Sequence, residues 1–300
     1  MRPRGKVTIR EVEMKHSVFT VLLPDKSLDE VFQLLNKLNY DGVELRIRED
    51  YHVPPDRILS SVKKLRDLMN QYKLEIPVLG TYLSIKEQKA LLPVFEAADL
   101  LGAKGVRVSL GPPLDGKMSY WSVLDELQRS LEAFLKATQP FKAKALFEIH
   151  FKTLISSPSL AYLLLKPFDP EKLGVIYDPG NMIIEGMEDW KLGVDLVKDY
   201  LWHVHAKNIS WRKEGTWKWA SDELEDGMVP WQEVLGALIS VNYDGYVSNE
   251  NLCGVVLPGA TGFIGEKLAG GKIEHPKPIQ TKLAQDLQYL KGLERKLISE

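Results

Sequence analysis

Four residues with metal-binding side chains stand at the ends of four successive apolar segments. They are Glu148, Asp178, His205 and Glu250, and each follows a short run rich in Val, Ile, Leu, Phe or Tyr. A carboxylate or imidazole gains nothing from burial in such a strand unless a partner compensates it. Carboxylates and imidazole together suit Mn²⁺, Mg²⁺ or Co²⁺, and also Zn²⁺. The sequence therefore predicts a site for one divalent ion.

Each of these residues also has an explanation without a metal. Either glutamate could form a salt bridge with Arg107 or Lys207 inside the protein. Asp178 opens the sequence Asp-Pro-Gly-Asn, which is also typical of a turn. His205 taken alone is more often a hydrogen-bonded core histidine. The metal interpretation rests on the coincidence of all four residues at matching strand ends.

Two other polar residues in the apolar segments are weaker candidates for the metal site. Glu44 lies in the second apolar segment and is interpreted as structural, since Arg46, Arg48 or Lys15 could pair with it. His203 has the same strand parity as the metal-binding histidine two residues later, but lies deeper in its strand. Neither is placed in the predicted site.

Two further histidines are candidates for substrate contact. His150 follows Glu148 by two residues and shares its face if the strand continues, which predicts a substrate or supporting role as readily as packing. His16, in the first strand, could reach a substrate from across the mouth of the fold, and packing is an equal alternative.

These residues need a scaffold that brings distant strand ends together. Apolar segments alternate with amphipathic ones, and several are apolar throughout, as expected of parallel strands covered on both faces. Eight such pairs without a break in composition favour a closed (β/α)8 TIM barrel over an open doubly wound sheet. The predicted strands are 14–20, 42–46, 75–80, 105–109, 145–149, 173–178, 201–206 and 245–250.

The predicted organisation is a single barrel domain over residues 1–300. Residues 209–228 contain three tryptophans between the seventh strand and its helix, where a lid would lie. Residues 253–278 are rich in glycine and proline and form a long predicted loop before a final helix at 279–298. Either segment could close over the site, and the second could also reach a neighbouring subunit.

Composition limits the partners of this chain. A net charge of −2 over 300 residues gives no general attraction to nucleic acid or anionic membranes. One cysteine, Cys253, excludes an intrachain disulfide framework, and no apolar run is long enough for a signal peptide or membrane span. We expect a cytoplasmic protein with a small-molecule substrate, either monomeric or a homo-oligomer.

The ordered motifs resemble the xylose isomerase-like, or sugar phosphate isomerase/epimerase, superfamily of TIM barrels. The resemblance spans residues 41 to 250 and includes ketose 3-epimerases, hydroxypyruvate isomerases, inosose-processing enzymes and, more distantly, endonuclease IV. Its signposts include Asp-Gly-Val-Glu-Leu-Arg at 41–46, Phe-Glu-Ile-His at 147–150, Asp-Pro-Gly-Asn at 178–181 and His-Val-His-Ala-Lys at 203–207.

The resemblance implies roles for individual residues. It makes Glu148, Asp178, His205 and Glu250 the metal ligands, and the two glutamates the catalytic acid/base pair. Asn181 stands where many epimerases have a histidine near the metal, and an arginine after the seventh-strand motif binds substrate in some relatives. The residues expected to contact substrate are His150, Asn181, Lys207, Arg212, Arg107 and His16.

The expected activity is a divalent-metal-dependent isomerisation or epimerisation of a sugar, ketose or polyol-derived ketone. Proton transfer would pass through a metal-stabilised enediolate. A dehydratase of an inosose-like substrate would use nearly the same parts, and an endonuclease IV-like phosphodiesterase would need more histidines than the six present. A non-catalytic sugar-binding barrel is the remaining alternative. No glycine-rich phosphate cradle is evident, which favours an unphosphorylated substrate.

Overall fold

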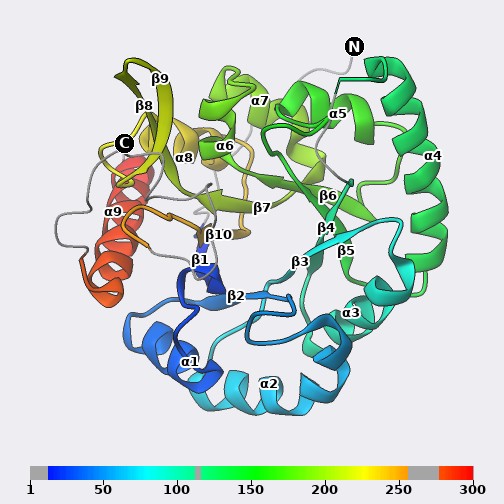
Figure 1. Ribbon diagram of the computed structural model, residues 1–300. Coiled ribbons are helices and arrows are strands. Elements are labelled where there is room, and N and C mark those ends of the chain that lie inside the picture. Colours follow the sequence, from blue (N-terminus) through cyan, green and yellow to red (C-terminus); the bar gives the residue numbers. More distant parts are fainter. Residues whose placement is uncertain (1–12, 112–115, 256–276, 300) are drawn as a thin grey trace.

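The chain forms a closed barrel of eight parallel strands surrounded by helices, as the sequence predicts. The computed structural model describes residues 13–111, 116–255 and 277–299. Neighbouring barrel strands pair in the order β1-β10-β7-β6-β5-β4-β3-β2, with helices outside them (Figure 1). The barrel strands are β1 (Lys15–Phe19), β2 (Gly42–Arg46), β3 (Val78–Ser84), β4 (Gly105–Ser109), β5 (Lys144–Glu148), β6 (Leu173–Tyr177), β7 (Leu201–Ala206) and β10 (Tyr246–Asn249).

The helices begin and end where local signals place them. Ser27 caps the first helix by accepting a hydrogen bond from the backbone N–H of Glu30, whose carboxylate in turn accepts from the Ser27 backbone. In the second helix, Ile58, Val62 and Leu65 lie on one buried face. The helices are α1 (Leu28–Lys37), α2 (Ile58–Tyr72), α3 (Gln88–Leu101), α4 (Tyr120–Thr138), α5 (Pro158–Leu165), α6 (Pro179–Ile184), α7 (Trp190–Val197), α8 (Trp231–Ser240) and α9 (Ile279–Ser299).

The third strand differs most from its predicted position. It was expected over residues 75–80, but β3 starts at Val78 and continues to Ser84. Glu75 forms only an isolated bridge with Gly42. Because Pro77 has no backbone N–H, it cannot donate to a neighbouring strand, and the regular ladder begins directly after it.

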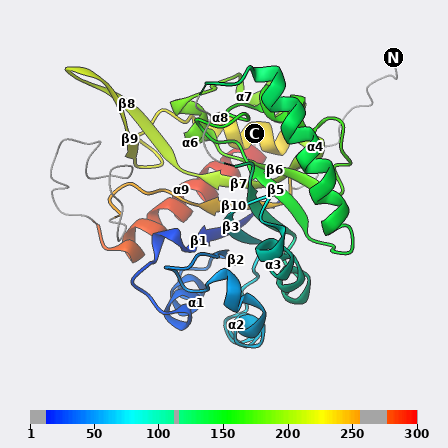
Figure 2. The same ribbon diagram turned by 45° about the vertical axis from the view of Figure 1, so that its right-hand side comes forward.

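The segment between β7 and α8 contains a β-hairpin. Strands β8 (Asn208–Glu214) and β9 (Thr216–Asp222) pair in antiparallel fashion and project away from the barrel (Figure 2). Trp211 anchors the hairpin by donating its indole N–H to the carbonyl of Ile183 at 2.9 Å, whereas Trp217 is exposed. The segment predicted as a lid is thus a hairpin held against α6, and a lid function for it stays a prediction.

Side chains inside the barrel change from apolar to polar along the strands. Because alternate residues of a strand face the same side, Leu146 precedes Glu148 on the inner face and Ile176 precedes Asp178. Val78, Leu146, Ile176 and the partly buried Trp202 form an apolar cluster at the deeper level. This cluster supports the polar residues that follow at the carboxyl-terminal end.

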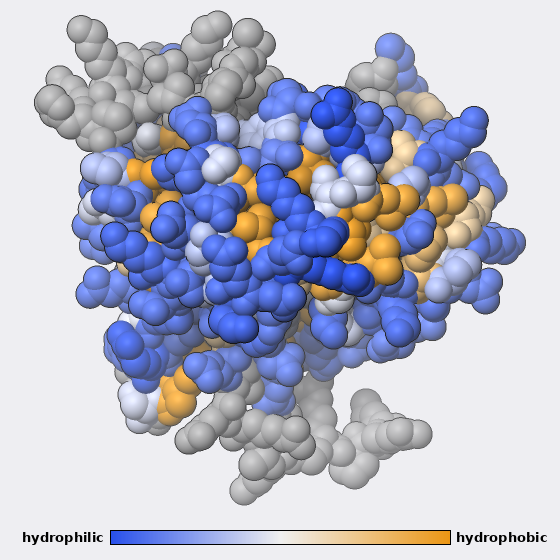
Figure 3. All heavy atoms as spheres, turned by 90° about the horizontal axis from the view of Figure 1, so that it is seen from below, coloured by the Kyte–Doolittle hydropathy of each residue, from blue (hydrophilic) through white to orange (hydrophobic). Residues whose placement is uncertain are grey.

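The outer surface is mainly hydrophilic on the face seen from below. Figure 3 shows polar side chains over most of this face, with apolar side chains in smaller groups between them. Leu59 on α2 and Leu100 on α3 are among the exposed large apolar residues of the chain. Among the described residues, no helix combines the length and apolar character needed to cross a membrane.

Most of the predicted long loop at 253–278 lies outside the described residues, which end at 255 and resume at 277. The final helix is confirmed as α9, whose buried residues include Leu283, Leu287 and Leu290. In Figure 1 this helix lies on the outside of the barrel, between α1 and α8.

Candidate metal centre

Four strand ends bring the predicted metal ligands into one cluster. Glu148 ends β5, Asp178 directly follows β6, His205 lies in β7, and Glu250 directly follows β10. One ligand atom from each residue lies within 4.8 Å of the others, and all four residues are buried. Parallel strands end at the same face of a barrel, which is why residues so distant in sequence meet here.

The imidazole of His205 is the centre of this cluster. Its Nδ1 atom lies 3.0 Å from Oε2 of Glu250, 3.3 Å from Oε1 of Glu148 and 3.6 Å from Oδ2 of Asp178. Burial opposes protonation of this ring, but the charges of Glu44 and Glu250 raise the pKa of His205 well above its ordinary value. Three carboxylates this close together require positive charge between them.

Lys207 supplies part of that charge. Its Nζ atom lies 2.7 Å from Oδ2 of Asp178, 3.0 Å from Oε2 of Glu250 and 3.7 Å from Oε1 of Glu148. Although burial alone would lower the pKa of Lys207, Asp178 and Glu250 raise it. The ammonium group is therefore charged and lies beside the oxygen atoms that would bind a metal.

Arg107 supplies the remaining neutralising charge through an ion pair with Oε2 of Glu148. Burial opposes ionisation of this glutamate, but Arg107 and His205 hold the pKa of Glu148 well below its ordinary value. Both salt bridges considered from the sequence are therefore present, one from Arg107 and one from Lys207. These salt bridges are present while the four ligand atoms still lie within 4.8 Å of one another.

Asp178 is the most easily protonated ligand of the set. Burial raises its pKa, Lys207 opposes that effect, and the charges of Glu148 and Glu250 reinforce it. Its Oδ1 atom accepts the N–H of Asn181 and caps α6, whereas its Oδ2 atom lies 2.7 Å from the Nζ atom of Lys207. The four side chains together offer three carboxylate oxygens and one imidazole nitrogen within 4.8 Å of one another, and this donor set fits a divalent ion.

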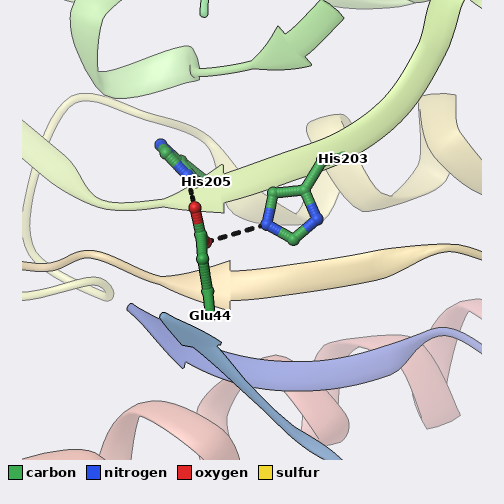
Figure 4. A group of neighbouring side chains, drawn as sticks. All are labelled: Glu44, His203 and His205. Atoms are coloured by element: carbon green, nitrogen blue, oxygen red, sulfur yellow. Dashed lines mark hydrogen bonds and ion pairs between the residues drawn. The ribbon is translucent and has the colours of Figure 1, made fainter. Parts of the chain in front are cut away.

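Glu44 lies beneath the cluster and holds two histidines of β7. Its Oε2 atom is 2.9 Å from Nε2 of His203, and its Oε1 atom is 3.2 Å from Nε2 of His205 (Figure 4). Burial opposes ionisation, but His205 and His203 lower the pKa of Glu44. The prediction that Arg46, Arg48 or Lys15 pairs with Glu44 is therefore wrong; the side chain points into the barrel toward the histidines.

A small cavity opens directly above the cluster. Its volume is about 220 Å³, and both Glu148 and Glu250 line it. Asn181 also faces the cavity, and its Nδ2 group donates to Oε1 of Glu148 at 3.0 Å and to the carbonyl of Ile149 at 3.1 Å. The residues expected to contact substrate that line this cavity are His150, Asn181, Lys207 and Arg107.

Two residues expected to contact substrate lie elsewhere. The Nε2 atom of His16 is 3.0 Å from Oε1 of Glu294 on α9, so this histidine faces the outer helix layer. Arg212 lies on the hairpin strand β8, half exposed, with its Nη2 atom 3.1 Å from Oδ2 of Asp222. Neither lines the cavity, and we leave both out of the proposed site.

Several residues that line the cavity were not assigned to the site from the sequence. Arg46, Tyr82 and Trp219 all line it. The position of Arg46 could have been predicted, because it follows Glu44 by two residues on the same strand and therefore faces the same side of the sheet. Tyr82 could not be placed because β3 extends beyond its predicted end.

The sequence of this chain is similar to that of one protein family and of one archaeal protein. A model of the xylose isomerase-like TIM barrel family matches residues 32–262. The uncharacterised protein MJ1311 of Methanocaldococcus jannaschii is 22% identical over 263 residues, covering 80% of this chain and 84% of that protein.

Two solved structures show the same fold at low sequence identity. D-psicose 3-epimerase from Clostridium cellulolyticum, solved with D-tagatose, superposes with a TM-score of 0.73 and 15% identity, covering 94% of this chain and 99% of its own. The 3-keto-D-glucoside 4-epimerase YcjR from E. coli gives a TM-score of 0.69 and 17% identity, covering 93% and 100%.

Proposed function

The chain belongs to the xylose isomerase-like TIM barrel family, and from this premise we propose that it is a divalent-metal-dependent isomerase or epimerase of a sugar or related ketone. The observation that carries this proposal is the position of Glu148 and Glu250, which share both the candidate metal centre and the cavity above it. Sugar epimerases among the solved structures of this fold support it.

The proposed metal ligands are Glu148, Asp178, His205 and Glu250. Three carboxylates and one imidazole form an oxygen-rich set, which favours Mn²⁺, Mg²⁺ or Co²⁺ over Zn²⁺. A bound ion would supply Lewis acidity toward a substrate carbonyl and an adjacent hydroxyl.

The two glutamates are the proposed proton-transfer groups. Arg107 and Lys207 favour their ionised forms, so either carboxylate can accept a proton from the carbon next to the carbonyl. Return of a proton to the opposite face requires a protonated donor. The Nζ atom of Lys207 lies 3.0 Å from Oε2 of Glu250, so this ammonium can pass a proton to Glu250, which then donates it to the substrate carbon. Use of both glutamates gives epimerisation, whereas use of one gives aldose–ketose isomerisation.

Solvent exchange tests this proposal. The protein, supplied with Mn²⁺ or Mg²⁺, is incubated in D₂O with a panel of ketoses and sugar acids, and the products are followed by NMR. We expect deuterium at one substrate carbon together with a new isomer; a product that has lost water would instead support the dehydratase. A complete absence of exchange and of product across the panel would contradict both the isomerase or epimerase activity and the dehydratase activity.

Matched variants locate the activity. Glu148→Gln and Glu250→Gln keep the size of each side chain and should each lower turnover by at least about a hundredfold, a typical contribution of a positioned acid or base. Glu132→Gln on the outer face of α4 removes an exposed carboxylate and should leave turnover unchanged. Unchanged turnover in both cavity variants would rule out the assigned proton-transfer roles.

A further inference from the structure

One buried cation in the cavity has no anionic partner. Arg46 ends β2 and is 4% exposed. Its guanidinium carbon lies 4.0 Å from the ring centre of Tyr51 and 4.9 Å from that of Tyr82. Over residues 13–111, 116–255 and 277–299, no carboxylate forms an ion pair with Arg46, and its Nε atom has no hydrogen-bond acceptor.

The aromatic rings compensate this charge only in part. A cation over an aromatic face gains about 0.5–2 kcal/mol, whereas removal of an ion from water costs several kcal/mol even after the protein relaxes. Buried arginines are therefore normally paired with an anion. Arg46 reaches the cavity wall, so the missing anion can arrive with a ligand.

Arg107 provides a second donor on the same side of the cavity. Its guanidinium carbon lies 4.6 Å from the ring centre of Tyr82, the ring that Arg46 also approaches. One edge of Arg107 pairs with Glu148, and its Nη1 atom is buried without a hydrogen-bond acceptor. Two guanidinium groups with unused donors thus face one small cavity.

The charge balance of the cavity points the same way. Three cationic side chains oppose the three carboxylates of the candidate metal centre, so a divalent ion would leave positive charge in excess. The carboxylate of Glu44 beneath the centre removes only part of that excess. The cationic side chains are Arg46, Arg107 and Lys207, and the carboxylates are those of Glu148, Asp178 and Glu250.

We propose that the substrate of this site carries an anionic group, a carboxylate or a phosphate, that binds between Arg46 and Arg107. This inference rests on the proposed function and narrows its substrate class from sugars and related ketones in general to sugar acids or sugar phosphates. The bidentate geometry of a guanidinium suits either anion. A carboxylate would agree with the expectation of an unphosphorylated substrate drawn from the lack of a glycine-rich cradle, whereas a phosphate would contradict it.

Calorimetric binding measurements on the Mn²⁺-loaded protein test the proposal with three probes: D-fructose, D-fructose 6-phosphate and 5-keto-D-gluconate. We expect at least one anion to bind at least about tenfold more tightly than D-fructose, the scale of a charged hydrogen bond. Arg46→Met should abolish that preference. Arg129→Met, which removes an exposed arginine of α4, should retain it. The anion that binds more tightly identifies phosphate or carboxylate as the preferred group.

Thermal unfolding separates a binding role from a structural one. If Arg46 serves to bind an anionic ligand, Arg46→Met removes an unpaired buried charge. The variant protein should then unfold at the same temperature as the wild type or at a higher one. Inorganic phosphate or malonate, at constant ionic strength, should stabilise the wild type more than this variant. A strong loss of stability in Arg46→Met with unchanged anion affinity would overturn the proposal.

The outcomes also separate this inference from the proposed function. An anion that binds through Arg46 but shows no deuterium exchange would uphold the anion site and count against the isomerase. Exchange confined to neutral ketoses, with turnover unaffected by Arg46→Met, would uphold the isomerase and overturn the anion site.

Discussion

Oε1 of Glu44 lies 3.2 Å from Nε2 of His205, so a carboxylate on β2 holds an imidazole on β7 from below. An ionised carboxylate accepts a hydrogen bond, which places the proton on Nε2 and leaves Nδ1 directed at the three carboxylates of the candidate centre. Phe19 stacks on the same ring at 5.8 Å between ring centres. Glu44 is therefore a positioning residue for a metal ligand.

Glu44→Gln should weaken Mn²⁺ binding by about 10–100-fold, the usual effect of losing a carboxylate behind a metal-binding histidine. The amide is a poorer acceptor and no longer enforces one tautomer. Calorimetry gives the affinity, and ¹⁵N NMR of the His205 ring reports its tautomer. Glu49→Gln, at an exposed position near the end of the same strand, is the control. Equal affinity and an unchanged ring spectrum in Glu44→Gln would argue against positioning.

Lys207→Met should make the fold dependent on metal. Without Lys207, the buried carboxylates of Asp178 and Glu250 lose their closest cation, and breaking a buried pair typically costs about 3–5 kcal/mol. A divalent ion would restore that charge. Denaturant unfolding with EDTA and with Mn²⁺ should therefore show a larger difference for this variant than for the wild type. A smaller difference would mean that the ion does not bind beside Lys207.

Metal binding should stabilise the protein in a way that requires Asp178. An ion present at a hundred times its dissociation constant adds about 2.7 kcal/mol to the free energy of unfolding. Asp178→Asn preserves an oxygen that can cap α6 but removes the ligand charge, so its melting temperature should respond little to Mn²⁺. A full response in this variant would place the ion elsewhere.

Acid should destabilise the metal-free protein through Glu250. Although burial alone would raise the pKa of this carboxyl, Lys207 and His205 lower it below its ordinary value of 4.5. Its ion pairs therefore contribute stability above that pH, and the contribution is lost as the pH falls through the lowered pKa. Unfolding curves from neutral pH downward should show this loss, and Glu250→Gln should reduce its slope. An identical slope in the variant would mean that other groups control acid unfolding.

The sequence was sufficient for the fold and for the meeting of the four ligands. Apolar strands of regular spacing specify a barrel, and parallel strands end on one face, so Glu148, Asp178, His205 and Glu250 meet whatever the loops do. The capping box at Ser27 likewise depends only on neighbouring residues. These features follow from local pattern and topology.

Side-chain contacts between strands that are not neighbours in the barrel could not be predicted from the sequence. The pairing of Glu44 with His203 and His205 joins β2 to β7, which are separated in the sheet by other strands, and depends on how far each side chain reaches inward. For His16 the sequence left substrate contact and packing as equal alternatives, and its side chain faces α9, where it pairs with Glu294. In this first strand the sequence alone did not show which residues face into the barrel and which face the outer helices.

The central claim is that one divalent ion binds among Glu148, Asp178, His205 and Glu250. Crystals grown with Mn²⁺, measured with X-rays at which manganese scatters anomalously, test it most directly. We predict one strong anomalous peak, about 2.0–2.2 Å from an oxygen of each carboxylate and from Nδ1 of His205, as for comparable divalent ions. A map with no peak among these four side chains, and Lys207 still between their oxygens, would contradict it.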